Sequence, residues 1–243
     1  MEILVLQHIA CEPPGAYEEV LLEQGAGIHR VELDQGHAIP DWRDFDGIIA
    51  MGGPMSANDD VALSWLKEEK AIIAEAVRAG VPYWGVCLGG QLLAASLGAR
   101  VYRGPRPEVG LLPVYLTGEA MGDRVFGGAP RELLTLQWHN DTFELPTGGV
   151  LLASSPLFPA QAFRWGACAY GLQFHLEVSA EMAREWASVP AYSSDLERVL
   201  GPGSLPRLIE RLDQSAGMLN AEGRKMFRRW LELVSAWKGE GAR

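Results

Sequence analysis

Cysteine is scarce in this chain, and long hydrophobic runs are missing. Three cysteines in 243 residues are too few, and odd in number, for the disulfide framework of a small secreted domain. We therefore expect a reducing, cytoplasmic environment. The apolar runs have the length of strands and fall well short of the roughly 20 residues that cross a bilayer, so we expect no membrane partner. Residues 1–6 have neither the basic start nor the cleavage site of a signal peptide, and they predict a first strand.

Positive charge is also in short supply. The 21 Lys and Arg residues are outnumbered by 31 Asp and Glu residues, which leaves a formal net charge of −10. The sequence has no basic stripe, so nucleic acid is not an expected partner. It also has no dense Cys/His cluster with zinc spacing and no glycine-rich phosphate loop followed by Lys and Ser or Thr. We expect neither a metal nor an organic cofactor.

Hydrophobic residues make up 48% of the chain, which is enough for one large domain with a sizeable core. Strand and helix patterns alternate through the first hundred residues, and this alternation predicts an α/β fold with a mostly parallel central sheet. The expected strands span residues 3–7, 28–32, 47–51 and 82–86, and the expected helices span residues 16–24, 62–79 and 89–97.

The helix signals fade after residue 101. Short apolar runs separated by Gly and Pro predict an antiparallel extension of the sheet. Its expected strands span residues 111–116, 133–138, 150–154 and 161–164. Ser179 then has the character of the N-cap of a helix that runs to about Ser188.

The chain changes character after Pro190. We expect a first domain over residues 1–190 and a C-terminal helical extension over residues 191–243. Two amphipathic helices are expected in the extension, one around 205–212 and one around 227–237. The simplest interpretation is a helical appendage that packs on the domain. The rival interpretation is an arm that docks a partner protein.

Cys87 is the most informative residue of the chain. It stands between Gly85 and Gly89 at the junction of an expected strand and an expected helix. This Gly-x-Cys-x-Gly pattern is typical of a nucleophile elbow, a turn so sharp that the flanking residues must lack side chains. The helix that follows directs its N-terminus at the sulfur and favours the reactive thiolate. The alternative is a buried structural cysteine.

A second segment supplies partners for a nucleophilic thiol. Near its end an expected strand reads His175-Leu176-Glu177. Alternate residues of an extended chain share a face, so the imidazole and the carboxylate can lean toward the same cleft. A nucleophile needs a base, and the base needs a group that holds its tautomer. Cys87, His175 and Glu177 can fill these three roles, although a core histidine at a strand end is the plainer alternative for His175.

The run from Gly85 to Gln91 and the later run from Gly171 to Glu177 resemble the class I glutamine amidotransferases over about residues 1–190. The chain is similar to the free-standing proteins that resemble the amidotransferase domain of GMP synthase. This resemblance implies a flavodoxin-like three-layer α/β sandwich and a Cys-His-Glu triad. It also implies glutamine hydrolysis through a cysteine γ-glutamyl thioester, with the ammonia passed to an acceptor or synthetase on another chain.

The resemblance further implies an oxyanion hole and a glutamine pocket. Gly53 (or Gly52) in the Gly-Gly-Pro turn and the backbone N–H of Leu88 match the oxyanion donors, although an ordinary turn has the same sequence. The expected substrate-binding residues are Gly52, Gln91, Glu108, Trp138, His139, Asn140 and Asp141. The segment 139–141 also fits a turn capped by Asn and Asp, and Glu108 also fits a solvated loop.

Three functions remain open at this point. The first is a glutamine amidotransferase that works with an acceptor enzyme. The second is a stand-alone γ-glutamyl peptide hydrolase, for which Trp84 and Trp138 either narrow the pocket or stack on the substrate. The third is a non-catalytic or redox-sensing cysteine protein, which the intact His-x-Glu segment disfavours. The sequence does not determine the oligomeric state.

Overall fold

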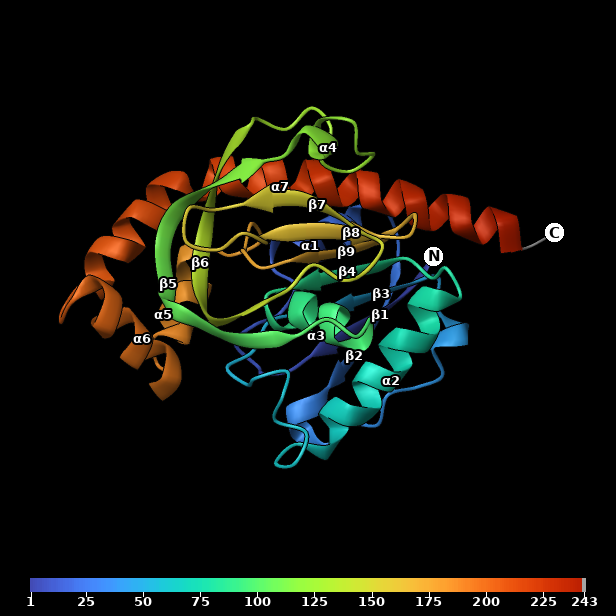
Figure 1. Ribbon diagram of the computed structural model, residues 1–243, viewed down its shortest axis with the longest axis horizontal. Coiled ribbons are helices and arrows are strands. Elements are labelled where there is room, and N and C mark those ends of the chain that lie inside the picture. The colour runs from blue at the N-terminus through green and yellow to red at the C-terminus, as the bar shows by residue number, and fades with distance from the viewer. Residues whose placement is uncertain (242–243) are drawn as a thin grey trace.

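The computed structural model describes residues 1–241 (Figure 1), and the last two positions of the expected extension, 242–243, lie outside it. A nine-stranded mixed sheet forms its centre, with the order β2-β1-β3-β4-β9-β8-β7-β5-β6. The strands are β1 (Glu2–Gln7), β2 (Gly27–Glu32), β3 (Gly47–Ala50), β4 (Tyr83–Val86), β5 (Val101–Leu116), β6 (Glu132–Phe143), β7 (Gly149–Ser154), β8 (Ala162–Trp165) and β9 (Ala169–Leu172).

The helices alternate with the first four strands and cluster again after the last. They are α1 (Ala16–Glu23), α2 (Ser64–Arg78), α3 (Leu88–Ser96), α4 (Gly118–Met121), α5 (Ala180–Trp186), α6 (Pro190–Leu200) and α7 (Leu205–Gly241), with short 3-10 turns η1 (Leu33–Gln35) and η2 (Trp42–Asp44). Ser179 caps α5 as predicted, because its side chain accepts a hydrogen bond from Met182 N. No helix within the described range is both long and apolar enough to span a membrane.

The parallel and antiparallel parts predicted from the sequence join in one sheet. β2, β1, β3, β4 and β9 pair in parallel, and β8, β7, β5 and β6 continue the sheet with antiparallel pairs. β5 and β6 are longer than expected because they pair along almost their whole length, with an irregularity between Arg103 and Glu108. In Figure 1 these two strands curl away from the parallel part. The α/β class is confirmed, whereas the comparison with flavodoxin stays a prediction.

Helices cover both faces of the parallel part. Ile3 and Val5 of β1 pack in one hydrophobic cluster with residues of α1 and α7. Leu4 and Leu6 pack in the other cluster, with residues of α2 and α3. This alternation along a strand places helices on both sides of the sheet and gives three layers.

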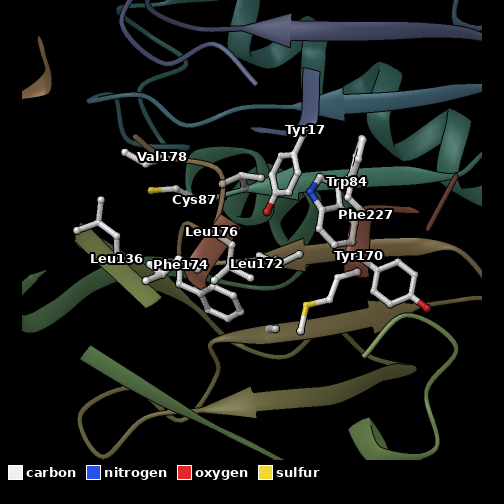
Figure 2. Packing of buried hydrophobic residues seen from close by; sticks show 14 of the residues in the cluster. Tyr17, Trp84, Cys87, Leu136, Tyr170, Leu172, Phe174, Leu176, Val178 and Phe227 are labelled. Atoms are coloured by element: carbon white, nitrogen blue, oxygen red, sulfur yellow. The ribbon is translucent and has the colours of Figure 1, made fainter. Parts of the chain in front are cut away.

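Aromatic side chains fill the layer between the sheet and the α1–α7 pair. Figure 2 shows Trp84 among Tyr17, Tyr170 and Phe227, with ring centroids 5.7–5.9 Å apart. Cys87 lies at the end of the same cluster. Strand β4, which ends just before Cys87, is therefore held in a rigid, densely packed environment.

The C-terminal region differs from the two expected helices. It contains α6, which the sequence analysis missed, and one continuous helix, α7, in place of the separate segments 205–212 and 227–237. Leu219 and Met226 lie between those segments and are buried, so the apolar face of the helix continues from one segment to the other. α7 is tied to the rest of the chain by a hydrogen bond from Trp230 Nε1 to Cys168 O (3.1 Å) and by one from Asn220 Nδ2 to Leu176 O (2.6 Å).

Candidate active site

Cys87 lies at the carboxyl end of β4 as the N-cap of α3. Its backbone has φ 51° and ψ −105°, and it is the one non-glycine residue with positive φ in the described range. Such a conformation costs about 1–3 kcal/mol and is concentrated at functional sites. A Cβ on Gly85 would lie 2.5 Å from Gly89 O, and one on Gly89 would lie 2.0 Å from Ala50 O. Both flanking glycines are therefore required by space, as the elbow pattern predicts.

His175 and Glu177 follow β9, although the strand ends earlier than expected, at Leu172. The chain then leaves β4 and pairs with β6 through an isolated bridge between His175 and Leu136. His175 Nδ1 donates to Glu177 Oε1 (2.7 Å), and Leu176 N donates to Glu177 Oε2 (3.0 Å). Both carboxylate oxygens are thus occupied, and the side-chain pair is almost fully buried.

The thiol of Cys87 interacts with His175 of this pair. Burial raises the pKa of Cys87, while the hydrogen bond and charge of His175 and the Leu88 N–H oppose the rise. Burial alone would lower the pKa of His175. The charge of Glu177 and the hydrogen bonds with Cys87 and Glu177 outweigh burial and hold the pKa of His175 well above its usual 6.5. The imidazole is therefore a strong proton acceptor for the thiol.

A cavity of about 310 Å³ opens in front of the sulfur. Its volume lies at the low end of the range for small-molecule sites, about 300–1,000 Å³. The residues that line it are Gly53, Pro54, Met55, Ser56, Asp59, Cys87, Gln91, Arg103, Trp138, His139, Asn140, Asp141, Ala191, Tyr192 and Asp195. Most of the residues expected to bind substrate are in this set, whereas Trp84, His175 and Glu177 are not.

The segment 139–141 is part of β6 and does not form the turn that was its alternative. His139 is fixed between Asp141 O (2.9 Å from Nδ1) and Glu108 Oε2 (3.1 Å from Nε2). Gln91 Nε2 donates to Asp141 O (3.1 Å). Asn140 Nδ2 donates to Asp195 on α6. The polar wall of the cavity is therefore held by bonds between β6, α3 and α6.

Besides His175 and Glu177, three expected site residues do not line the cavity. Glu108 is buried on β5 behind His139 and accepts a further hydrogen bond from Gln161 Nε2 (2.7 Å). Gly52 is turned toward Glu12, because a Cβ at this position would lie 2.0 Å from Glu12 Oε2. The Leu88 side chain packs in the α2–α3 cluster, while its N–H faces the sulfur.

The sequence analysis missed several groups at this site. Tyr192 and Asp195 come from α6, and the Tyr192 hydroxyl donates to the buried Glu12. Trp186 packs edge-on against the His175 ring, with centroids 4.7 Å apart. The signal for Glu12 was available, because ligands in open α/β sheets bind beyond the carboxyl ends of the strands and Glu12 follows β1.

The remaining cysteines and the carboxylates show no other reaction centre. All three cysteines are free. Burial raises the pKa of both Cys11 and Cys168 to about 11. Within residues 1–238, no group of three or more His, Cys, Asp or Glu side chains is placed to hold a metal ion.

Known proteins resemble this chain over a range that includes Cys87 and His175. The family model "glutamine amidotransferase class-I" matches residues 17–186. The chain belongs to the class I glutamine amidotransferase family. The glutamine amidotransferase-like protein YfeJ of Salmonella typhimurium is 31% identical over 185 residues, which cover 74% of this chain and 77% of that protein. One of the separate subunits of the glutamine-hydrolysing GMP synthase from Saccharolobus solfataricus is 33% identical over 175 residues, which cover 68% of this chain and 85% of that polypeptide.

A crystal structure of a glutamine amidotransferase from Thermotoga maritima superimposes on this amidotransferase with a TM-score of 0.86 at 29% identity. The match covers 96% of this chain and 98% of the other. It therefore includes most of α6 and α7, although the family model ends at residue 186.

Proposed function

We propose that this amidotransferase hydrolyses the side-chain amide of glutamine through a γ-glutamyl thioester on Cys87 and passes the ammonia to an acceptor enzyme on another chain. One observation carries the proposal. The strained elbow presents Cys87 to the cavity, with the bonded His175–Glu177 pair directly behind it. The family membership and the similarity to a separate polypeptide of GMP synthase support it.

The reaction follows from the placement of the three side chains. His175 takes the proton of Cys87, and the sulfur attacks the amide carbon of glutamine. The proton on His175 then passes to the leaving nitrogen, and ammonia departs. Water, deprotonated by the same imidazole, cleaves the thioester and releases glutamate. Glu177 holds the proton on Nδ1 throughout, so that Nε2 is free to exchange the proton with the reacting atoms.

The negative oxygen of each tetrahedral intermediate needs donors. We assign this role to the N–H groups of Leu88, which faces the sulfur, and of Gly53, which lines the same cavity as Cys87. Each such donor contributes about 3–4 kcal/mol in comparable enzymes. The polar wall formed by Gln91, Asn140 and Asp141 is placed to bind the amino acid part of the substrate.

A γ-glutamyl amide with a small amine as its leaving group is the second candidate substrate. The observation that favours it is the part of the cavity lined by Ser56, Asp59 and Arg103, which offers polar groups beyond those needed to release ammonia. By contrast, the burial of Cys87, whose exposure is 5%, disfavours a redox sensor, because sensor thiolates are accessible to the oxidant.

We further propose that residues 1–190 form the amidotransferase domain and that the C-terminal extension packs on it and completes the site. α6 supplies Tyr192 and Asp195 to the cavity. Asn220 of α7 supports the backbone between His175 and Glu177. The extension thus contributes to the site as well as covering the sheet.

Release of ammonia and glutamate by the purified protein tests the function. Glutamine is compared with a panel of γ-glutamyl peptides, and Cys87→Ser serves as the blank. Turnover of glutamine that Cys87→Ser abolishes supports the amidotransferase, and faster turnover of a peptide transfers the proposal to the second candidate. If no substrate is cleaved and an electrophilic glutamine analogue leaves Cys87 unlabelled, the proposal is wrong.

A further inference from the structure

A second buried His–Glu pair lies behind the Gly52–Gly53 loop. His8 follows β1 and Glu69 belongs to α2, and both side chains are fully buried. His8 Nε2 is 3.0 Å from Glu69 Oε1, and His8 Nδ1 is 3.2 Å from Gly52 O. Neither side chain lines the cavity or contacts the sulfur. The reaction described above gives this pair no role.

Both partners of the His8 ring are acceptors, one a carboxylate and the other a backbone carbonyl. The ring satisfies both only when each nitrogen carries a proton. Burial acts to lower the pKa of His8, but the charge of Glu69 and the hydrogen bonds to Glu69 and Gly52 outweigh it and raise this pKa above its usual value. His8 therefore donates to Gly52 O from a ring that Glu69 holds in place.

Stability alone is a weak reason for such a pair. Taking two charges out of water carries a desolvation penalty that their attraction often does no more than offset, and apolar replacements are frequently neutral or stabilising. The ring also stacks on Trp65 of α2, with centroids 5.7 Å apart, a contact that an apolar ring would make equally well. What an apolar ring lacks is the hydrogen bond to Gly52 O.

The carbonyl that His8 holds and the N–H of Gly53 belong to the same peptide unit. Every described peptide bond is trans, so the N–H points opposite to the carbonyl and away from His8. Gly53 lines the cavity together with Cys87. With a glycine on each side, no Cβ restricts the rotation of this peptide plane, and a rotated plane would present a carbonyl oxygen where the reaction needs a donor.

We propose that His8, fixed by Glu69, is a positioning residue that aims the Gly53 N–H at the oxyanion formed on Cys87. The inference rests on the proposed function, because it concerns the same reaction. It explains why a buried charged pair is placed against the Gly52–Gly53 loop and not against Cys87, His175 and Glu177. His8 touches neither the substrate nor the sulfur and acts only through the peptide.

Two reagents that label Cys87 in different ways test the proposal. A diazoketone analogue of glutamine needs its ketone oxygen polarised before the sulfur attacks, whereas iodoacetamide loses iodide without forming an oxyanion. The ratio of the two labelling rates therefore reports the oxyanion donors separately from the reactivity of the thiol. Labelling needs no acceptor enzyme, so the full chain is used alone, with its folding checked by thermal melting.

Three variants of His8 separate the two hydrogen bonds. His8→Phe removes both. His8→Asn places an amide nitrogen close to the position of Nδ1 and keeps the donor to Gly52 O, whereas His8→Gln places it close to Nε2 and keeps only the contact with Glu69. His29→Phe is the matched control, since His29 is an exposed ring that packs on Phe45 far from the cavity.

Deleting an oxyanion donor costs about 10²–10³-fold in rate, so misaligning one should lower the labelling ratio by about 10–100-fold. We expect this loss in His8→Phe and His8→Gln, with the iodoacetamide rate within about twofold of wild type and most of the loss recovered in His8→Asn. An unchanged labelling ratio in folded His8→Phe and His8→Gln would overturn this inference and leave the proposed function standing. An equal fall of the diazoketone rate and the iodoacetamide rate would do the same. Failure of the diazoketone to label the wild type would instead overturn the proposed function, and the inference with it.

Discussion

The replacement Glu177→Gln tests how the site holds its base. Glu177 accepts from His175 Nδ1 at 2.7 Å and from Leu176 N at 3.0 Å. The Leu176 N–H can only donate, so the carbonyl oxygen of a glutamine must take that position. The amide NH2 group then faces Nδ1 and needs a lone pair there. The imidazole is forced to carry its proton on Nε2, on the side of the thiol, where it cannot act as a base.

The size of the effect follows from this geometry. An isosteric swap that only weakened a charge-assisted hydrogen bond would cost about 1.5–3 kcal/mol, or roughly 10–150-fold in rate. A wrong tautomer costs more, and the corresponding Asp→Asn change in a serine protease lowers kcat about 10⁴-fold. We therefore expect Glu177→Gln to lose about 10³–10⁴-fold in kcat and to be at least as poor as Glu177→Ala, which leaves the tautomer free.

The assay is glutamine hydrolysis at saturating substrate, or the diazoketone labelling rate where turnover is slow. Thermal melting serves as the control for folding. If folded Glu177→Gln kept more than about a tenth of the wild-type rate, or clearly exceeded Glu177→Ala, the tautomer argument would be refuted. In that case the carboxylate would act only through its charge.

Four further predictions concern the elbow, helix α7, the second His–Glu pair and the other thiols. Gly89→Ala should lower the Tm by about 6–12 °C, because its Cβ meets the backbone of β3 at 2.0 Å and overpacking costs about 3 kcal/mol. Gly217→Ala, whose Cβ meets nothing within 4 Å on α7, should raise it by about 2–4 °C. The pKa of His8 is raised in the folded chain, so its stabilising effect should be complete below about pH 6.5. The Tm difference between wild type and His8→Phe should then shrink as the pH rises through the raised value, and a difference that grows with pH would contradict this sign. Cys11 and Cys168, with pKa values of about 11, should be about one-thousandth thiolate at pH 8 and should escape labelling by iodoacetamide, as peptide mass spectrometry would detect.

The sequence predicted the parallel part of the fold well. The expected strands and helices up to residue 97 agree with the structure to within about two residues. Each of these elements has a clear apolar period and ends at a glycine, a proline or a polar turn. Local patterns are sufficient where a strand is a short apolar run buried on both faces and a helix has one apolar face that packs on such strands.

The C-terminal half was harder because its elements depend on distant partners. Strand β6 continues through the polar segment 139–141 since β5 pairs with it, and no apolar alternation marks this stretch. α6 buries only Tyr192, Asp195 and Leu196, and its contacts with Glu12 and Asn140 are hydrogen bonds to residues far away in the sequence. These contacts link positions up to 180 residues apart, which no local pattern contains.

The sequence by itself determined the geometry of the elbow, since the glycines on either side of Cys87 are a local requirement of so sharp a turn. Only the tertiary structure decided what surrounds that thiol. It brought α6 to the cavity, placed Glu108 behind His139, and set His8 and Glu69 against the Gly52–Gly53 loop. The reason is physical, because a turn is specified by the residues within it, whereas a pocket is formed by side chains from separate elements that meet only when the sheet has assembled and its helices have packed.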